Sequence, residues 1–354
     1  MDGNLRLVWN RKMAVQVDVK RRKLLEQSGK FLTGSLLSSL GLPLSSFGQN
    51  ISSYPNKPIR IVIPFAAGGT LDAMIRPISQ PLSTALGQPI IIENRAGANG
   101  MIGAEMVAKS SPDGYTLFAT SASFVLNPSI YKDIKYDVIK DFTPISSLMR
   151  GVGFVLLVHP SVPANTLQEL IALDKKTNSP LAYSSPGIGN TVHIASELFN
   201  QRAGTHFLHV PYKGSGPSLN ALVSGEVQIG ITPPGVVMQF IKTGKLKALA
   251  FTGSSRLPEL PEVPLMSEVG VKDMIFEGTW MGLLGPGGMP QPIVQKIYSE
   301  MSKCLHEPGL QNNLSTSVSG YVVEASTPEQ FAKKLRDDIK RYNEILKKIN
   351  FQPT

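Results

Sequence analysis

Beyond residue 54, short apolar runs alternate with longer stretches of helical periodicity, and this alternation limits the possible folds more than any other feature. Strands separated by helices predict parallel strands joined by crossover helices. Because most of the runs are apolar throughout, we expect helices on both faces of their sheets. The chain is therefore predicted to be an α/β protein. The expected strands are residues 59–64, 90–94, 115–120, 153–159, 181–184, 207–211, 227–232, 247–252 and 281–284.

Two helices are predicted from their first residues. Thr166 and Glu169 have the spacing of a capping box, in which each side chain bonds the other residue's amide. Thr327 and Gln330 repeat this spacing, with Pro328 at the first helical position. The second of these helices has one apolar face, which predicts that it packs along its whole length. The residues of this face are Phe331, Leu335, Ile339, Tyr342, Ile345 and Ile349.

Two prolines fall in the helix expected after Gly69. Pro77 and Pro81 each remove a backbone donor and crowd the preceding turn. They predict a helix that is kinked or begins late.

Residues 1–48 have the layout of an export signal. A basic cluster at 20–23 precedes an uncharged stretch from 31 to 44, which contains leucines and phenylalanine among small residues. The pair Arg21 and Arg22 favours the twin-arginine route over general secretion. An amphipathic helix is the alternative, but the apolar residues leave no charged face. We expect cleavage near Gly48 and a mature protein in the periplasm.

The charge of the chain excludes a nucleic-acid-binding surface. The net charge is +9, from 35 Lys and Arg and 26 Asp and Glu. Residues 1–48 hold eight of the basic and three of the acidic side chains, so they carry +5 of this total. The other charges are mixed in sign. No apolar run approaches the length of a membrane-spanning helix, and the single Cys304 excludes an internal disulfide.

Three loops that follow expected strands are rich in Gly, Ser and Thr: residues 64–72, 120–123 and 184–193. Amides at the start of a helix lack carbonyl partners and attract anions. In α/β sheets, ligands bind at these carboxyl ends of the strands. The alternative is that the glycines serve turns and the polar residues cap helices. The candidate ligand-binding residues are Phe65, Gly68, Gly69, Thr70, Asp72, Ser121, Ser123, Ser184, Gly187, Gly189, Asn190, Thr191 and His193.

Nucleotide and metal sites are not supported. Gly187 and Gly189 lack the third glycine of a dinucleotide fingerprint, and the loop containing Gly69 has no lysine for a phosphate loop. His206 and His209 point to opposite faces of their strand, so we interpret them as structural. We expect no cofactor and no metal.

A hydrolase is a rival of another class. A triad could be assembled from Ser184 or Ser185 with His193 and Asp72, but the chain has no Gly-x-Ser-x-Gly elbow. We expect Asp72 to lie in a first helical turn, where the helix dipole favours a carboxylate.

Several spaced motifs resemble those of the Bug receptors, the extracytoplasmic solute-binding proteins of tripartite tricarboxylate transporters. They begin with the Tyr-Pro pair at 54–55 and include Pro-Phe-Ala-Ala-Gly-Gly at 64–69 and His-Val-Pro-Tyr-Lys-Gly at 209–214. Further matches lie at 93–104, 112–117, 244–250 and 260–264.

The resemblance implies a two-domain periplasmic binding protein of type II-like architecture. Each domain would be a sheet flanked by helices, and two crossing segments would join them. We expect domain 1 to comprise 54–153 and 254–354, and domain 2 to comprise 154–253. One carboxylate ligand would lie between the domains, held by amides, hydroxyls and waters.

These features predict a monomeric binding protein that captures a small organic carboxylate, closes by a hinge movement and performs no chemistry. Its expected partners are membrane transporter subunits, and a membrane sensor is the alternative. Many relatives carry an acid and then Asn where this chain has Thr232 and Pro233. Thr232 is therefore a further candidate ligand-binding residue. Without that acid, the ammonium group of an amino-acid ligand would have no anionic partner, so we expect a ligand without a free amine.

Overall fold

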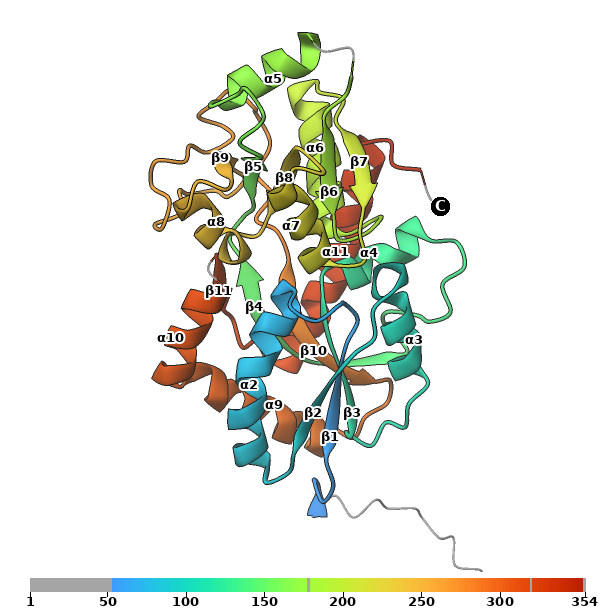
Figure 1. Cartoon of the computed structure of the whole chain (residues 1–354). Helices are drawn as coiled ribbons and strands as arrows, with labels where there is room; N and C mark the ends of the chain where they lie inside the picture. Colours follow the sequence, from blue (N-terminus) through green and yellow to red (C-terminus); the bar gives the residue numbers. More distant parts are fainter. Residues whose placement is uncertain (1–52, 177–178, 319, 353–354) are drawn as a thin grey trace, which may run out of the picture. The chain divides into compact units, whose positions relative to one another are not determined.

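The computed structural model describes residues 53–176, 179–318 and 320–352, and these form two mixed sheets flanked by helices (Figure 1). The first sheet has the strand order β11-β4-β10-β3-β1-β2. β1 is parallel to β2 and β3, whereas β10 is antiparallel to β3 and β4. Its strands are β1 (Ile59–Ile63), β2 (Ile90–Asn94), β3 (Thr116–Ser121), β4 (Phe142–Gly151), β10 (Trp280–Pro286) and β11 (Tyr321–Val323).

The second sheet has the strand order β7-β6-β8-β5-β9. β6 is parallel to β7 and β8, and β5 is antiparallel to both of its neighbours. The four residues of β5 are all buried, which agrees with a strand covered on both faces. Its strands are β5 (Val155–Val158), β6 (Ala182–Ser185), β7 (Leu208–Pro211), β8 (Ile229–Thr232) and β9 (Lys247–Phe251).

Helices join the strands and cover the sheets (Figure 1). Those that connect strands of the first sheet are α2 (Thr70–Leu86), α3 (Met101–Ala108) and α4 (Ser123–Ile130). Those of the second sheet are α5 (Leu167–Lys176), α6 (Thr191–Ala203), α7 (Ser215–Ser224) and α8 (Met238–Lys242). The chain then adds α9 (Gln291–His306), α10 (Pro308–Ser317) and α11 (Pro328–Lys348). Short 3-10 turns are η2 (Ala98–Gly100) and η3 (Pro234–Val236).

Two segments cross between the sheets, one from β4 to β5 and one from β9 to β10. They are hydrogen-bonded to each other: Thr252 donates its amide to the Phe154 carbonyl at 2.9 Å and accepts the Phe154 amide on its hydroxyl at 2.8 Å. Gly153 has φ +150°, and a β-carbon there would lie 2.5 Å from the Phe251 ring. Only glycine allows the two segments to lie this close.

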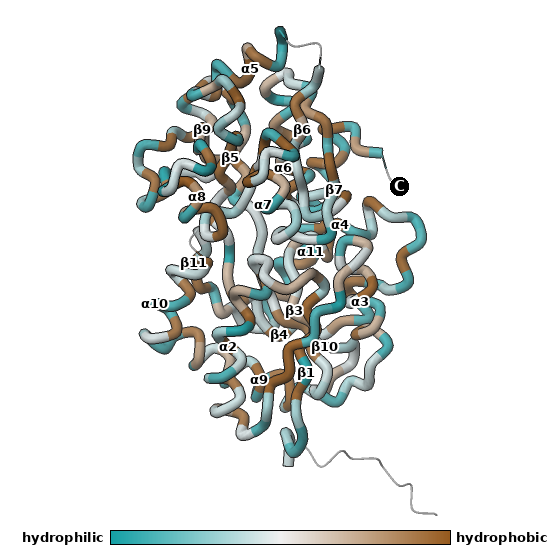
Figure 2. Tube along the Cα trace, in the orientation of Figure 1, coloured by the Kyte–Doolittle hydropathy of each residue, from teal (hydrophilic) through white to brown (hydrophobic). Residues whose placement is uncertain are grey.

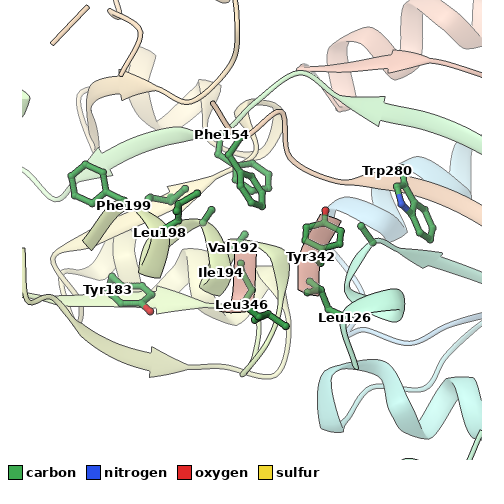
Figure 3. Packing of buried hydrophobic residues seen from close by; sticks show 14 of the residues in the cluster. Leu126, Phe154, Tyr183, Val192, Ile194, Leu198, Phe199, Trp280, Tyr342 and Leu346 are labelled. Atoms are coloured by element: carbon green, nitrogen blue, oxygen red, sulfur yellow. The ribbon is translucent and has the colours of Figure 1, made fainter. Parts of the chain in front are cut away.

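The hydrophobic core extends from one sheet to the other. Figure 2 shows the concentration of apolar residues along β1, whose last three residues are buried. One buried cluster contains Trp280 of the first sheet and Tyr183 of the second. Figure 3 shows Leu346 of α11 near Val192 and Ile194 of α6, all members of this cluster. The C-terminal end of α11 therefore packs against α6, one of the helices of the second sheet.

The α/β class and the two crossing segments are confirmed. The expectation of parallel strands was wrong in part, because the chain enters and leaves the second sheet along antiparallel strands. Two strands were not predicted, β4 and β11. β4 contains Pro144, Ser146 and Ser147, which hide its strand pattern.

The starts of α2 and α5 differ in part from their predictions. α2 begins at Thr70, immediately after Gly69, and continues through both prolines, so a late start was wrong. At α5, Thr166 accepts the Glu169 amide, but the Glu169 carboxylate accepts from Asn165, so only half of the predicted box forms. The export signal at residues 1–48 lies outside the described residues.

The capping box of α11 forms as predicted and provides a test of helix stability. Thr327 accepts the Gln330 amide, and Gln330 accepts the Thr327 amide at 2.9 Å. Thr327→Ala should lower the free energy of unfolding by about 1 kcal/mol, since it leaves a helix amide without its acceptor. Urea denaturation followed by circular dichroism measures this. Thr316→Ala, at an exposed position inside α10, is the control and should change stability by less than half as much. Equal effects of the two substitutions would contradict the capping role.

Candidate functional site

A cavity of about 40 Å³, partly open to solvent, is lined by residues from both sheets and from the crossing segments. In this structure it has room for water molecules. The lining residues are Phe65, Ala66, Gly69, Thr70, Leu71, Asp72, Ser121, Phe154, Asn190, Thr191, Val192, Ser215, Pro233, Thr279, Met281 and Tyr321.

The start of α2 forms one side of the cavity. The first hydrogen bond of the helix runs from the Ala73 amide to the Gly69 carbonyl, so the amides of residues 70–72 precede it. Gly69 has φ −80° and provides no side-chain cap. These amides therefore present the positive end of the helix dipole to the cavity.

Asp72 fixes the loop before α2. Its carboxylate accepts hydrogen bonds from the Gly68 backbone amide at 3.0 Å, from Arg76 Nε–H at 2.7 Å and from the Asn94 side-chain amide at 3.1 Å. Burial by itself would raise the pKa of Asp72, but the hydrogen bonds from Arg76, Gly68 and Asn94 together lower it. The carboxylate is thus ionised at neutral pH and already has its partners inside the protein.

The start of α6 forms a second side. Asn190 is the N-cap, and its side-chain oxygen accepts the Val192 amide at 3.0 Å. Its side-chain amide donates to Ser123 Oγ at 3.0 Å, and the Thr191 amide also donates to this oxygen at 3.3 Å. Ser123 begins α4, so a residue next to the first sheet holds the cavity loop of the second.

The start of α7 completes the enclosure. A β-carbon on Gly69 would lie 3.8 Å from Cβ of Ser215, and one on Gly214 would lie 3.5 Å from the Ala66 amide nitrogen. In Figure 1 the beginning of α2 is next to α7, in agreement with these distances. Three helix N-termini therefore meet at one cavity. Among the described residues, no Lys, Arg or His lines it.

The remaining wall comes from the crossing segments and the strands next to them. Phe154 directly precedes β5, and Met281 belongs to β10. Thr279 accepts the Ala122 amide at 3.1 Å, and its own carbonyl accepts the Gly151 amide at 2.7 Å. Tyr321 follows Gly320, whose carbonyl accepts the Val152 amide. This wall is apolar apart from the hydroxyls of Thr279 and Tyr321.

Half of the predicted ligand-binding residues line the cavity. These are Phe65, Gly69, Thr70, Asp72, Ser121, Asn190 and Thr191. The others are absent from its lining, because their polar groups bond within the protein or face elsewhere. They are Gly68, Ser123, Ser184, Gly187, Gly189, His193 and Thr232. Ser184, for example, donates to the Ser218 carbonyl at 3.0 Å.

A second cavity lies beside the first and shares Phe65 with it. Its lining includes Gly187, Tyr131 and Lys213, together with the turn at 97–100. Gly187, a predicted ligand-binding residue, lines this second cavity.

Buried His193 of α6 and half-buried His209 of β7 form a stacked pair. Their rings stack with centroids 3.7 Å apart, and Tyr183 stacks on His209 at 5.0 Å. His193 Nδ1 accepts the Gly189 amide at 2.9 Å. Burial lowers the pKa of His193 to about 3, with a contribution from His209, and lowers that of His209 to about 4. Both rings are therefore neutral at pH 7 and support the loop that carries Asn190.

The residues of the alternative hydrolase triad have separate partners. Ser185 Oγ is 2.6 Å from Nε2 of His209, not of His193, and Ser185 is fully buried. The Asp72 carboxylate is occupied by the hydrogen bonds described above. His206 Nδ1 lies 3.8 Å from the Asp174 carboxylate.

The described part of the chain contains no group of three or more His, Cys, Asp or Glu arranged to hold a metal. Its helices are all too short or too polar to cross a membrane.

Several lining residues were missed from the sequence. Ser215 directly follows the 209–214 motif, which could have drawn attention to it. Phe154, Thr279 and Tyr321 lie in segments without glycine-rich loops or motifs, and only the crossing of the chain brings them together.

Comparison with known proteins identifies close structural relatives. A family model described as the tripartite tricarboxylate transporter family receptor matches residues 74–351. The structure of periplasmic binding protein BugD has 32% sequence identity and a TM-score of 0.80, covering 85% of this chain and all of BugD. An R. palustris protein solved with adipate has 29% identity and a TM-score of 0.80, with coverage of 85% and 100%. MatC from Rhodopseudomonas palustris, solved with malate, has 30% identity and a TM-score of 0.77, with coverage of 83% and 100%.

The stacked histidine pair predicts acid sensitivity. The folded pKa of His193, about 3, is below the unfolded value, so the unfolded state binds more protons. The free energy of unfolding should therefore fall as the pH drops from about 6.5 toward 3. The His193 ring should account for about 1.4 kcal/mol of this loss per pH unit. His193→Asn keeps an acceptor for Gly189 but has no proton to gain.

Urea unfolding at pH 7.5 and pH 5.0 tests this expectation. The loss of stability between these pH values should be smaller in His193→Asn than in the unsubstituted protein by about 2 kcal/mol. His306→Asn, at an exposed position, is the control and should leave the loss unchanged. The same pH dependence in all three proteins would show that the pair does not titrate as described.

Proposed function

The chain belongs to the tripartite tricarboxylate transporter receptor family, and from this premise we propose that it captures a small organic carboxylate for a membrane transporter. The ligand would bind in the cavity lined by both sheets. Related proteins have been solved with adipate and malate, which supports a carboxylate as the ligand. In this proposal the protein is exported to the periplasm, acts as a monomer and performs no chemistry on its ligand.

The convergence of three helix N-termini carries this proposal. The starts of α2, α6 and α7 line the cavity, and their dipoles favour an anion there. The Thr191 and Val192 amides of α6 already donate to Ser123 and Asn190, so the amides of α2 and α7 would donate to the anion. With no basic side chain in the described lining, the backbone is the main source of positive potential. A carboxylate fits this arrangement because it accepts several hydrogen bonds at once.

We propose domains with the boundaries expected from the sequence, 54–153 with 254–354 and 154–253. The strand membership of the two sheets supports this division, since every strand of the second sheet lies between 155 and 251. The two crossing segments would form the hinge, and closure would bring α2 toward α6 and α7 around the ligand.

A ligand without a free amine fits the cavity. A buried ammonium needs an anionic partner. Asp72 is the only acid in the lining, and its carboxylate is already used by Arg76, Asn94 and Gly68. Thr232 does not line the cavity and carries no charge.

Matched pairs of ligands test the proposal. A thermal-shift screen of carboxylates should yield a ligand that raises stability by about 2.7 kcal/mol at 100 times its dissociation constant. Succinate should bind at least tenfold more tightly than aspartate, and glutarate more tightly than glutamate, because each pair differs only in the ammonium. Isothermal titration measures the affinities. If either amino acid binds more tightly than its matched dicarboxylate, the prediction of a ligand without an amine is wrong. A screen without any hit would refute carboxylate capture.

The contribution of the N-cap amide just before α2 can be tested at Gly69. The φ of −80° suits proline, and a β-carbon there would have its nearest contact at 3.5 Å, so both alanine and proline are sterically compatible. Gly69→Pro removes an N–H group, whereas Gly69→Ala keeps it. For the best ligand of the screen, proline should weaken binding at least tenfold more than alanine does.

Lys213→Ala is the charge control for this experiment, because Lys213 lines the second cavity and not the first. Its affinity should stay within about twofold of the unsubstituted protein. Strong loss of binding in Lys213→Ala, with Gly69→Pro tolerated, would indicate that a side-chain charge holds the ligand.

A further inference from the structure

Two buried hydroxyl groups in the cavity lining have no hydrogen-bond partner among the described residues. They are Thr70 Oγ1 and Tyr321 OH. The two residues are only 6% and 8% exposed. A buried polar group without a partner costs about 1–3 kcal/mol, so such groups in native proteins usually serve a ligand or water.

The two hydroxyls belong to different parts of the cavity. Thr70 is the first residue of α2, where the helix amides favour an anion. Tyr321 begins β11 on the wall formed by the crossing segments, together with Phe154 and Met281. A ligand carboxylate at the helix starts would therefore meet Thr70, and the rest of the ligand would extend along the apolar wall toward Tyr321.

The wall lacks the means to hold a second charge. None of its residues is basic, and the three helix N-termini are at the starts of α2, α6 and α7. A buried carboxylate needs a cation or several donors, whereas one phenol hydroxyl can satisfy one neutral acceptor. Burial raises the pKa of Tyr321, which keeps this hydroxyl protonated at neutral pH.

We infer that the ligand carries a single carboxylate on an apolar body, with an uncharged hydrogen-bonding group at the far end that pairs with Tyr321. This inference rests on the proposed function and narrows its ligand class. Tyr321 is thereby a specificity-determining residue, and Thr70 contributes to the carboxylate end.

Two ligand series with constant bodies test the inference. One is hexanoate, 6-hydroxyhexanoate and adipate, and the other is benzoate, 4-hydroxybenzoate and terephthalate. Within the series that fits the cavity, isothermal titration should rank the hydroxy acid first and the dicarboxylate last. Tyr321→Phe should weaken the hydroxy acid about tenfold and leave the unsubstituted acid within about twofold. Tyr298→Phe, a tyrosine of α9 outside the cavity lining, is the matched control and should change neither affinity.

The outcomes separate this inference from the function on which it rests. Tightest binding by a dicarboxylate, in either series or in the wider carboxylate screen, would overturn the single-charge class while carboxylate capture stands. An equal loss of affinity for both monocarboxylates in Tyr321→Phe would show that Tyr321 does not determine specificity. The ranking in the unsubstituted protein does not depend on how well either variant folds. Absence of any carboxylate hit in the wider screen would refute the proposed function itself.

Discussion

The amides at the start of a helix have no carbonyl partner within it, and this constraint determines where the site lies. α2, α6 and α7 each follow a strand of a sheet, so their first amides lie at the carboxyl ends of β1, β6 and β7. The two sheets are placed so that these ends meet. Asp72 and Asn190 then hold the loops in position through hydrogen bonds inside the protein. At α2 and α7, amides and not a basic side chain are left to attract an anion.

The parts of the fold that depend on neighbouring residues could be predicted from the sequence. The Thr327 capping box needs only residues within one turn, and the loop at Gly69 follows an apolar strand directly. β4 could not be recognised, because Ser146 and Ser147 are buried polar residues whose partner, Ser326, lies about 180 positions away along the chain. The residues of the cavity lining also come together from distant parts of the chain, so their neighbours could not be recognised from local sequence.

Tyr321 and Thr279 illustrate why part of the cavity lining was not predicted from the sequence. Neither belongs to a loop with a recognisable composition, and each reaches the cavity only because β11 and β10 lie beside β4. His193 was also a candidate ligand-binding residue, and in the structure its ring accepts the Gly189 amide. Side-chain direction at a helix start depends on what packs behind it, here His209.

The bonds from Ser123 to the α6 loop have a consequence for kinetics. Ser123 accepts from Asn190 and Thr191, and Tyr131 donates to the Ile188 carbonyl at 2.8 Å. All these atoms belong to the protein, so the bonds hold α4 and the α6 loop together with or without a ligand. In the proposed solute capture, each bond would add to the barrier that is crossed before a bound solute leaves. The residence time of the solute should therefore be set largely by protein contacts outside the cavity. A membrane partner that loosens α4 from the α6 loop would accelerate release without touching the solute.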